Sequence, residues 1–228
     1  MLLGVIGFVL PPTLAKIYDC GQLDEVKLVL RYSLKYFLLF AIPFVCGSAV
    51  VGRHVLALLS TQDIANKGHL IIPIIALSTL LYGANTVNTS RLSLVKKTKN
   101  IGTVWITAGL TNLILNIAIV PHWGIIGAAV TTLITYTLVF VVMTYLSGLE
   151  FGFDPDLVFI CKSIVSAAVM CFFLIIINPS GTFALIFSVI LGSFIFFLSL
   201  YLLNGFNRKE IDFFKYFCFD VLLERVKT

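Results

Sequence analysis

Residues 101–147 read IGTVWITAGLTNLILNIAIVPHWGIIGAAVTTLITYTLVFVVMTYLS. The stretch contains two apolar runs, 101–121 and 124–147, which hold no Asp, Glu, Lys or Arg and are separated by a very short break. A hydrocarbon core about 30 Å thick is crossed by about 20 apolar residues in a helix, so each run is long enough to span. Because proline ends helices, we expect one helix to stop at Pro121 and the next to begin at Gly124. The stretch therefore predicts a transmembrane helical hairpin.

Further apolar runs of similar length lie on both sides of this hairpin. The 228-residue chain is 59% hydrophobic and 12% charged, with a mean hydropathy of +1.04, whereas soluble domains carry about 25% charged residues. We therefore expect an all-α fold, a polytopic transmembrane helix bundle with six full spans and a partial N-terminal one. The partial helix, residues 1–16, is short and interrupted by Pro11-Pro12. Besides the hairpin, the full spans are predicted at about 34–59, 69–91, 157–178 and 182–204.

The connections between the runs differ in Lys and Arg content, and these residues accumulate on the cytoplasmic side of membrane proteins. Alternate breaks are short and nearly uncharged, so one orientation satisfies every connection and places the C-terminus in the cytoplasm. The net charge of +5 is then explained by residues that orient the chain in the membrane, and nucleic acid is not an expected partner. The basic connections carry Lys16, Lys27, Arg31 and Lys35, then Arg91, Lys96, Lys97 and Lys99, and in the tail Arg208, Lys209, Lys215, Arg225 and Lys227.

This orientation divides the chain into a transmembrane lobe, residues 1–205, and a tail, residues 206–228. In the tail, Phe214, Phe217 and Val221 recur at helical spacing among charged residues, which predicts an amphipathic helix at the cytoplasmic interface. The partial helix would arrive from the outside, so we expect an N-terminal portion to precede it.

Polar residues inside the predicted spans are candidates for a substrate path, because polar groups in hydrocarbon usually face a bundle interior or a wet cavity. Asn112 and Asn116 lie four residues apart and therefore on one helix face. The alternative for every asparagine is a hydrogen bond between helices. Arg53 either reaches outward to the interface or faces a cavity, where its planar donors would suit phosphate. The candidates are Arg53, Asn85, Asn88, Arg91, Asn112 and Asn116.

Arg91 opens a basic cluster that has two interpretations. It is either a topology signal only or an attraction for anionic lipid headgroups at the inner leaflet. No predicted span contains Asp or Glu, and the sequence has no Ser/His/Asp arrangement, no phosphate-binding glycine loop and no Cys/His metal spacing. The sequence therefore predicts a protein that is not an enzyme and has no cofactor or metal ion.

Several segments resemble a known family. The pattern Asn112-x3-Asn116-x4-Pro121-x2-Gly124-x2-Gly127-Ala-Ala, followed by a Thr-rich helix, resembles the signature of polysaccharide-biosynthesis membrane proteins. These include the O-antigen flippases of the multidrug/oligosaccharidyl-lipid/polysaccharide exporter superfamily. Leu-Pro-Pro-Thr-Leu-Ala-Lys at 10–16, Gly21-x3-Glu25, Arg31-Tyr-Ser-Leu-Lys35-Tyr36 and Ile42-Pro43 are similar to family segments in the same order.

The resemblance implies the C-terminal half of a fourteen-helix flippase, from a partial eighth helix onward. In that family two six-helix lobes enclose a central cavity, and two extra helices follow. The implied partners are membrane lipids, a polyprenyl-pyrophosphate-linked oligosaccharide and a missing N-terminal lobe. The implied activity is flipping of that lipid across the cytoplasmic membrane for surface polysaccharide biosynthesis. The alternatives are a multidrug or cation antiporter of the same superfamily, or a non-transporting membrane remnant or scaffold.

Overall fold

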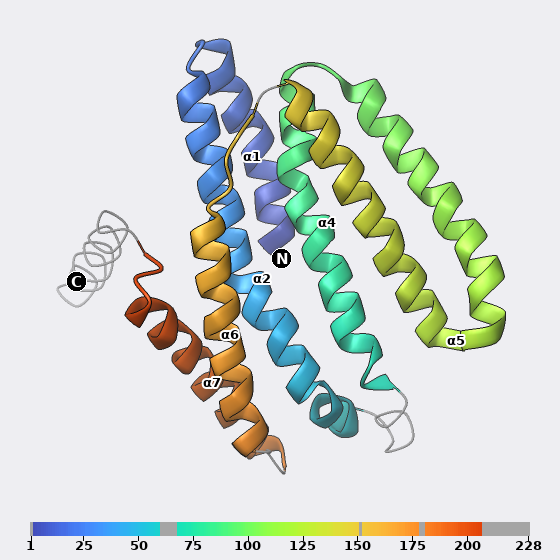
Figure 1. Cartoon of the computed structure of the whole chain (residues 1–228), viewed down its shortest axis with the longest axis vertical. Coiled ribbons are helices and arrows are strands. Elements are labelled where there is room, and N and C mark those ends of the chain that lie inside the picture. Colours follow the sequence, from blue (N-terminus) through green and yellow to red (C-terminus); the bar gives the residue numbers. More distant parts are fainter. Residues whose placement is uncertain (1, 60–67, 151, 178–180, 207–228) are drawn as a thin grey trace, which may run out of the picture.

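The computed structural model describes residues 2–59, 68–150, 152–177 and 181–206, and within these ranges the regular elements are helices without strands. The predicted all-α class is therefore confirmed. The predicted tail lies outside the described residues beyond Phe206. The helices are α1 (Leu2–Asp19), α2 (Leu23–Leu59), α4 (Ile71–Leu94), α5 (Thr98–Glu150), α6 (Leu157–Ile177) and α7 (Thr182–Leu202) (Figure 1).

The number of membrane-spanning helices differs from the prediction. Among the described residues, five helices are long and apolar enough to cross a membrane, against six predicted spans. The difference lies in α5, whose 53 residues are interrupted by a non-helical backbone at Gly124 (φ 57°, ψ −138°). Such a φ is open to glycine because it lacks a Cβ. Figure 1 shows α5 folding back on itself there, so its first limb (98–123) and second limb (125–150) are the two predicted spans.

The partial helix predicted at 1–16 is longer than expected, because α1 continues through both prolines to Asp19. Tertiary packing explains why the prolines do not end it. Leu10 and Leu14 are buried together with Val26 and Leu30 of α2, and burial of an apolar face outweighs local propensity. The chain then turns at a residue with φ +76°, Gly21, before entering α2.

Helix α2 begins at Leu23, well before the predicted start of the span at residue 34. Acidic side chains occupy its first turn, where they complement the positive end of the helix dipole, and Val26 and Leu30 are fully buried one turn apart. The helix therefore extends beyond the predicted span into the predicted first connection. Arg31 and Lys35 lie on a helix, and this placement matters for the site described below.

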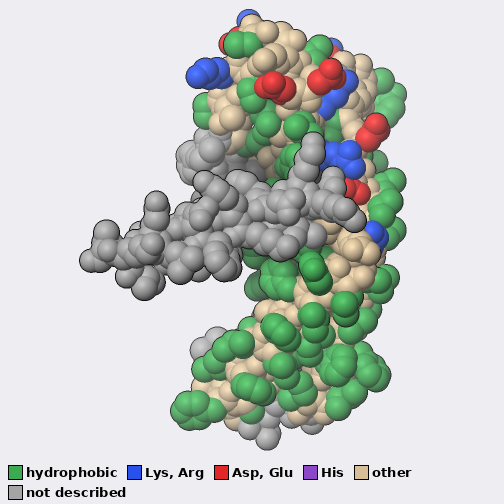
Figure 2. Space-filling view, turned by 90° about the vertical axis from the view of Figure 1, so that its left-hand side faces the viewer, with side chains coloured by type: hydrophobic (Ala, Val, Ile, Leu, Met, Phe, Trp, Pro, Cys, Tyr) green, Lys and Arg blue, Asp and Glu red, His purple; other side chains and the backbone are tan. Residues whose placement is uncertain are grey.

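Helix α2 is the centre of the bundle, since it contacts α1, α4, α6 and α7, and Figure 1 shows it between α4 and the α6–α7 pair. Helix α5 packs against α4 at the edge. Figure 2 shows hydrophobic side chains over the lower part of one face and charged side chains gathered on the upper part. Helices with such apolar outer faces are stable in lipid, and the chain is a multi-pass membrane protein.

Candidate functional site

Arg91 is the centre of a polar network between α4 and the second limb of α5. Its side chain is buried, and its guanidinium donates from Nη1 to Ser147 Oγ (2.9 Å) and Asn88 Oδ1 (3.3 Å) and from Nη2 to the Ser147 carbonyl (2.9 Å). Asn88 Nδ2 also donates to Thr144 Oγ1 (2.8 Å), and the Phe153 ring lies 5.1 Å from the guanidinium carbon. The network joins two of the six candidates, and its contacts hold α4 and α5 together.

Asn112 and Asn116 form a second network inside the α5 hairpin. Asn116 donates to Asn112 Oδ1 (2.8 Å), and Asn112 donates to Thr135 Oγ1 on the opposite limb (3.1 Å). Thr131 Oγ1 donates back to Asn116 Oδ1 (2.8 Å). These contacts correspond to the interhelical hydrogen bonds that the sequence left open as the alternative to a substrate path.

The remaining candidates, Asn85 and Arg53, are placed differently from these networks. Asn85 is 1% exposed on α4, and neither polar atom of its amide has a hydrogen-bond partner within the described part of the chain. Arg53 is exposed on α2, ahead of the end of that helix. The six candidates therefore do not form one cluster.

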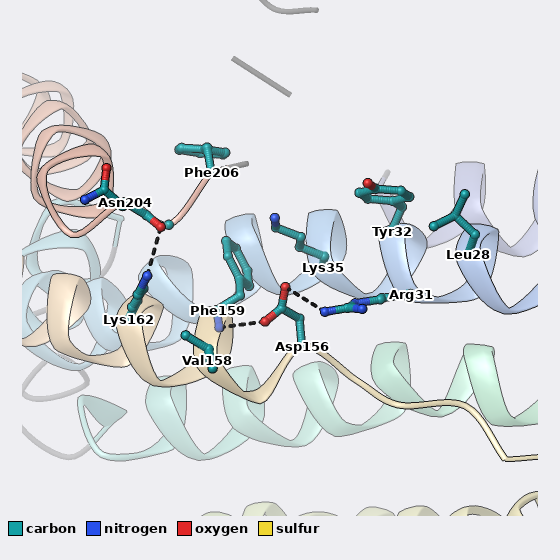
Figure 3. A pocket seen from close by; sticks show the side chains of 11 residues that line it. Leu28, Arg31, Tyr32, Lys35, Asp156, Val158, Phe159, Lys162, Asn204 and Phe206 are labelled. Atoms are coloured by element: carbon teal, nitrogen blue, oxygen red, sulfur yellow. Dashed lines mark hydrogen bonds and ion pairs between the residues drawn. The ribbon is translucent and has the colours of Figure 1, made fainter. Parts of the chain in front are cut away.

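A basic pocket that the sequence did not single out lies between the first half of α2, the start of α6 and the end of α7. Its cavity has a volume of about 310 Å³, and Figure 3 shows three basic side chains from α2 and α6 around one carboxylate. We call it the basic pocket; its charged lining residues are Arg31, Lys35, Asp156 and Lys162, and its other lining residues are Leu28, Tyr32, Val158, Phe159, Asn204, Gly205 and Phe206.

Asp156 fixes one wall of the basic pocket by capping α6. Its Oδ1 accepts the backbone N–H of Phe159 (3.0 Å), which is an N-cap contact, and its Oδ2 lies 3.3 Å from Arg31 Nη2. Desolvation acts to raise the pKa of this carboxyl, but the Phe159 N–H, Arg31 and the more distant charge of Lys35 together hold the pKa below its ordinary value. The carboxylate is therefore ionised and ties α6 to α2.

The two lysines of the basic pocket are positioned by different contacts. Lys35 is only 6% exposed, and its Nζ lies 4.8 Å from the centre of the Phe159 ring. Lys162 Nζ donates to the carbonyl of Asn204 (2.9 Å). Asn204 follows the end of α7 and has a φ of +51°. The i, i+4 spacing of Arg31 and Lys35 is a signal that could have placed them on one helix face. The contribution of Lys162 depends on α6 folding back against α2.

No family model matches the chain. Over 132 residues the chain is 33% identical to the probable flippase AglR of Haloferax volcanii, and the match covers 56% of this chain. Over this stretch the chain is similar to a probable flippase. The resemblance to flippases of the polysaccharide exporter type, drawn above from the sequence motifs, is confirmed. The chain spans about a quarter of the relative's length, 27%.

Proposed function

We propose that this chain forms one lobe of a membrane flippase that moves a lipid-pyrophosphate-linked oligosaccharide across the cytoplasmic membrane for surface polysaccharide biosynthesis. The observation that carries the proposal is the 33% identity to a probable flippase. It is supported by a bundle of apolar helices long enough to span. Because the match covers 27% of that relative, we propose that a second lobe completes the transporter and that residues 1–205 form the C-terminal lobe.

We assign the substrate path to Asn85 and Arg53. A buried amide without a hydrogen bond costs about 1–3 kcal/mol, so Asn85 is best explained by a polar partner other than the described side chains, such as water or a sugar hydroxyl. Arg53 supplies a guanidinium, which binds phosphate oxygens in a bidentate manner. The asparagines at 88, 112 and 116 and Arg91 already hold neighbouring helices together, and we give them a structural role.

The proposed transport movement is rocking of one lobe against the other around a central site, as in other transporters built from two repeats. This movement requires each lobe to keep its shape. The hydrogen bonds between α4 and α5 and the ion pair between α2 and Asp156 support such a rigid lobe. We further propose that the basic ends of the helices and the tail, 206–228, lie in the cytoplasm, as the Lys and Arg distribution predicts.

The test is complementation in a flippase-deleted strain. The chain is fused to a flippase N-terminal lobe, its insertion is verified in membranes, and surface polysaccharide is measured. We expect rescue by the wild-type fusion and reduced export, at unchanged abundance, by the Arg53→Ala fusion. The matched control is Lys99→Ala, which removes an exposed cation outside the proposed path. An inserted wild-type fusion that restores no polysaccharide would contradict the proposed function, and equal export by Arg53→Ala would remove Arg53 from the path.

A further inference from the structure

An apolar groove lies on the same three helices as the basic pocket. Its cavity has a volume of about 410 Å³ and is lined by residues of α2, α6 and α7 and by one residue of α4. Phe40 and Phe44 of α2 border the groove with their rings 46% and 69% exposed. Gly47 and Gly192 also line it, and a Cβ at either position would lie 3.5 Å or 3.2 Å from a side chain of α6, so these glycines let the helices approach closely. The groove is therefore an apolar channel open at the bilayer side of the bundle.

The basic pocket and the groove follow one another in the same order along α2 and α6, which both run downward in Figure 1. On α2, Lys35 lines the basic pocket and Phe40 lines the groove, a separation of about 7.5 Å at 1.5 Å per residue. On α6, Lys162 lines the basic pocket and Met170 the groove, about 12 Å apart. The basic pocket and the apolar groove are therefore spaced like the headgroup and the upper acyl chains of a lipid.

The charges of the basic pocket match an anionic headgroup. Its lining contains three basic side chains and one carboxylate, and that carboxylate is paired with Arg31. The described lining residues therefore carry a net positive formal charge, which suits an anionic phosphate group. Basic pockets between transmembrane helices on the cytoplasmic side bind phosphate-bearing lipid headgroups, and the Lys and Arg distribution predicts that this end is cytoplasmic.

We propose that this seam of α2, α6 and α7 is a binding site for a phosphate-headed membrane lipid, with the phosphate between Lys35 and Lys162 and an acyl chain in the apolar groove. The lipid is a resident of the lobe that joins α6 and α7 to α2, separate from the transported substrate. The proposal does not depend on the proposed function, because binding is measured without transport.

The test uses the full 228-residue chain in detergent and native mass spectrometry with three probes. Dioleoyl phosphatidic acid carries both headgroup and chains, inorganic phosphate carries the anion alone, and dioleoylglycerol carries the chains alone. We expect saturable binding of one phosphatidic acid per chain and at least about tenfold weaker binding of the other two probes. Equal binding of inorganic phosphate would overturn the proposal in favour of a soluble anion site, and equal binding of dioleoylglycerol would overturn the role of the basic pocket.

Variants separate the two halves of the site. Each basic residue near an anionic lipid is worth about fivefold in affinity, so the double variant Lys35→Gln/Lys162→Gln should bind phosphatidic acid about 25-fold more weakly. Lys35→Arg/Lys162→Arg should restore binding, and the matched control Lys99→Gln should bind like the wild type. Wild-type affinity in the double glutamine variant would overturn the proposal.

A substitution in the groove gives an independent readout if the double glutamine variant does not purify as a folded chain. Ser193 lines the groove and is exposed on α7, so Ser193→Phe fills the groove without entering the helix packing. We expect this variant to bind phosphatidic acid at least about fivefold more weakly, which is roughly the loss of a CH₂ or two from apolar contact. Its binding of inorganic phosphate should be unchanged. Unchanged affinity for phosphatidic acid would show that no chain occupies the groove and would overturn the proposal.

Discussion

Replacement of Arg91 by lysine is the sharpest test of how α4 and α5 are held together. The guanidinium makes hydrogen bonds to Ser147 Oγ, the Ser147 carbonyl and Asn88 Oδ1. A lysine retains the charge but has a single nitrogen, so it can replace about one of these contacts. Two contacts are then lost at a buried position.

The magnitude follows from the environment of those contacts. Hydrogen bonds between helices of a membrane protein contribute on average about 0.6 kcal/mol and at most about 1.7 kcal/mol each. Two lost contacts therefore correspond to about 1–3 kcal/mol. Charged hydrogen bonds in water-soluble proteins reach about 1.5–3 kcal/mol each, and the buried Ser147 carbonyl loses a charged donor, so we expect a value in the upper half of the range.

The assay is reversible unfolding of the purified chain in mixed micelles, followed by the loss of helical circular dichroism with increasing denaturing detergent. Lys99→Arg is the matched control, because Lys99 is exposed and should leave the free energy of unfolding within about 0.5 kcal/mol of wild type. Ser147→Ala should destabilise the chain less than additively with Arg91→Lys, since both remove the same contact. A free energy for Arg91→Lys within about 0.5 kcal/mol of wild type would refute the reasoning.

Three further predictions concern packing, helix contact and pH. Gly127→Leu should lower membrane abundance, because a Cβ there would lie 3.0–3.2 Å from atoms of Ile119 and Trp123. The control Gly109→Leu should leave abundance unchanged, because the space around Gly109 is open. Immunoblots of membrane fractions check both variants. Cys46 of α2 and Cys171 of α6 pack against the same buried cluster, so copper-phenanthroline oxidation should cross-link them within one chain. Mass spectrometry that finds both thiols unmodified would count against this packing. Because folding lowers the pKa of Asp156, its stabilising contribution is complete above the unfolded-state pKa of about 3.9 and is lost as the pH falls through the lower folded value. The wild type should lose stability in this pH range during acid unfolding. If Asp156→Asn lost stability in the same way, the effect would belong to another titrating group.

The fold was largely accessible from the sequence because lipid imposes strong constraints on it. Every backbone polar group in the hydrocarbon must be satisfied within its own segment, so long apolar runs form helices. The predicted spans at 157–178 and 182–204 correspond closely to α6 and α7. The errors lie where water and tertiary packing replace that constraint, as at the start of α2, whose amphipathic turns are buried against α1.

The candidate residues were only partly interpretable from the sequence because spacing does not identify a partner. Asn112 and Asn116 were correctly placed on one face, but the distinction between a cavity and a hydrogen bond depends on Thr135 of the returning limb. Asn88 and Arg91 likewise meet residues more than fifty positions away. A short motif indicates which side chains share a helix face. What that face contacts depends on the helix packed against it, which the motif does not identify.

The basic pocket shows why topology signals and binding sites are hard to separate in a membrane protein. Arg31 and Lys35 were read as markers of the cytoplasmic side, and that reading uses only their position along the chain. The same prediction places them at the headgroup level, and in the structure α6, α7 and their ends add a lysine, a helix-capping carboxylate and an apolar groove. The two roles are separable by experiment. Because many lysines and arginines set the orientation, the double variant Lys35→Gln/Lys162→Gln should keep reporter fusions in the 91–100 connection on the wild-type side while it loses lipid affinity. If instead the fusions moved to the other side, the lysines would act mainly through topology.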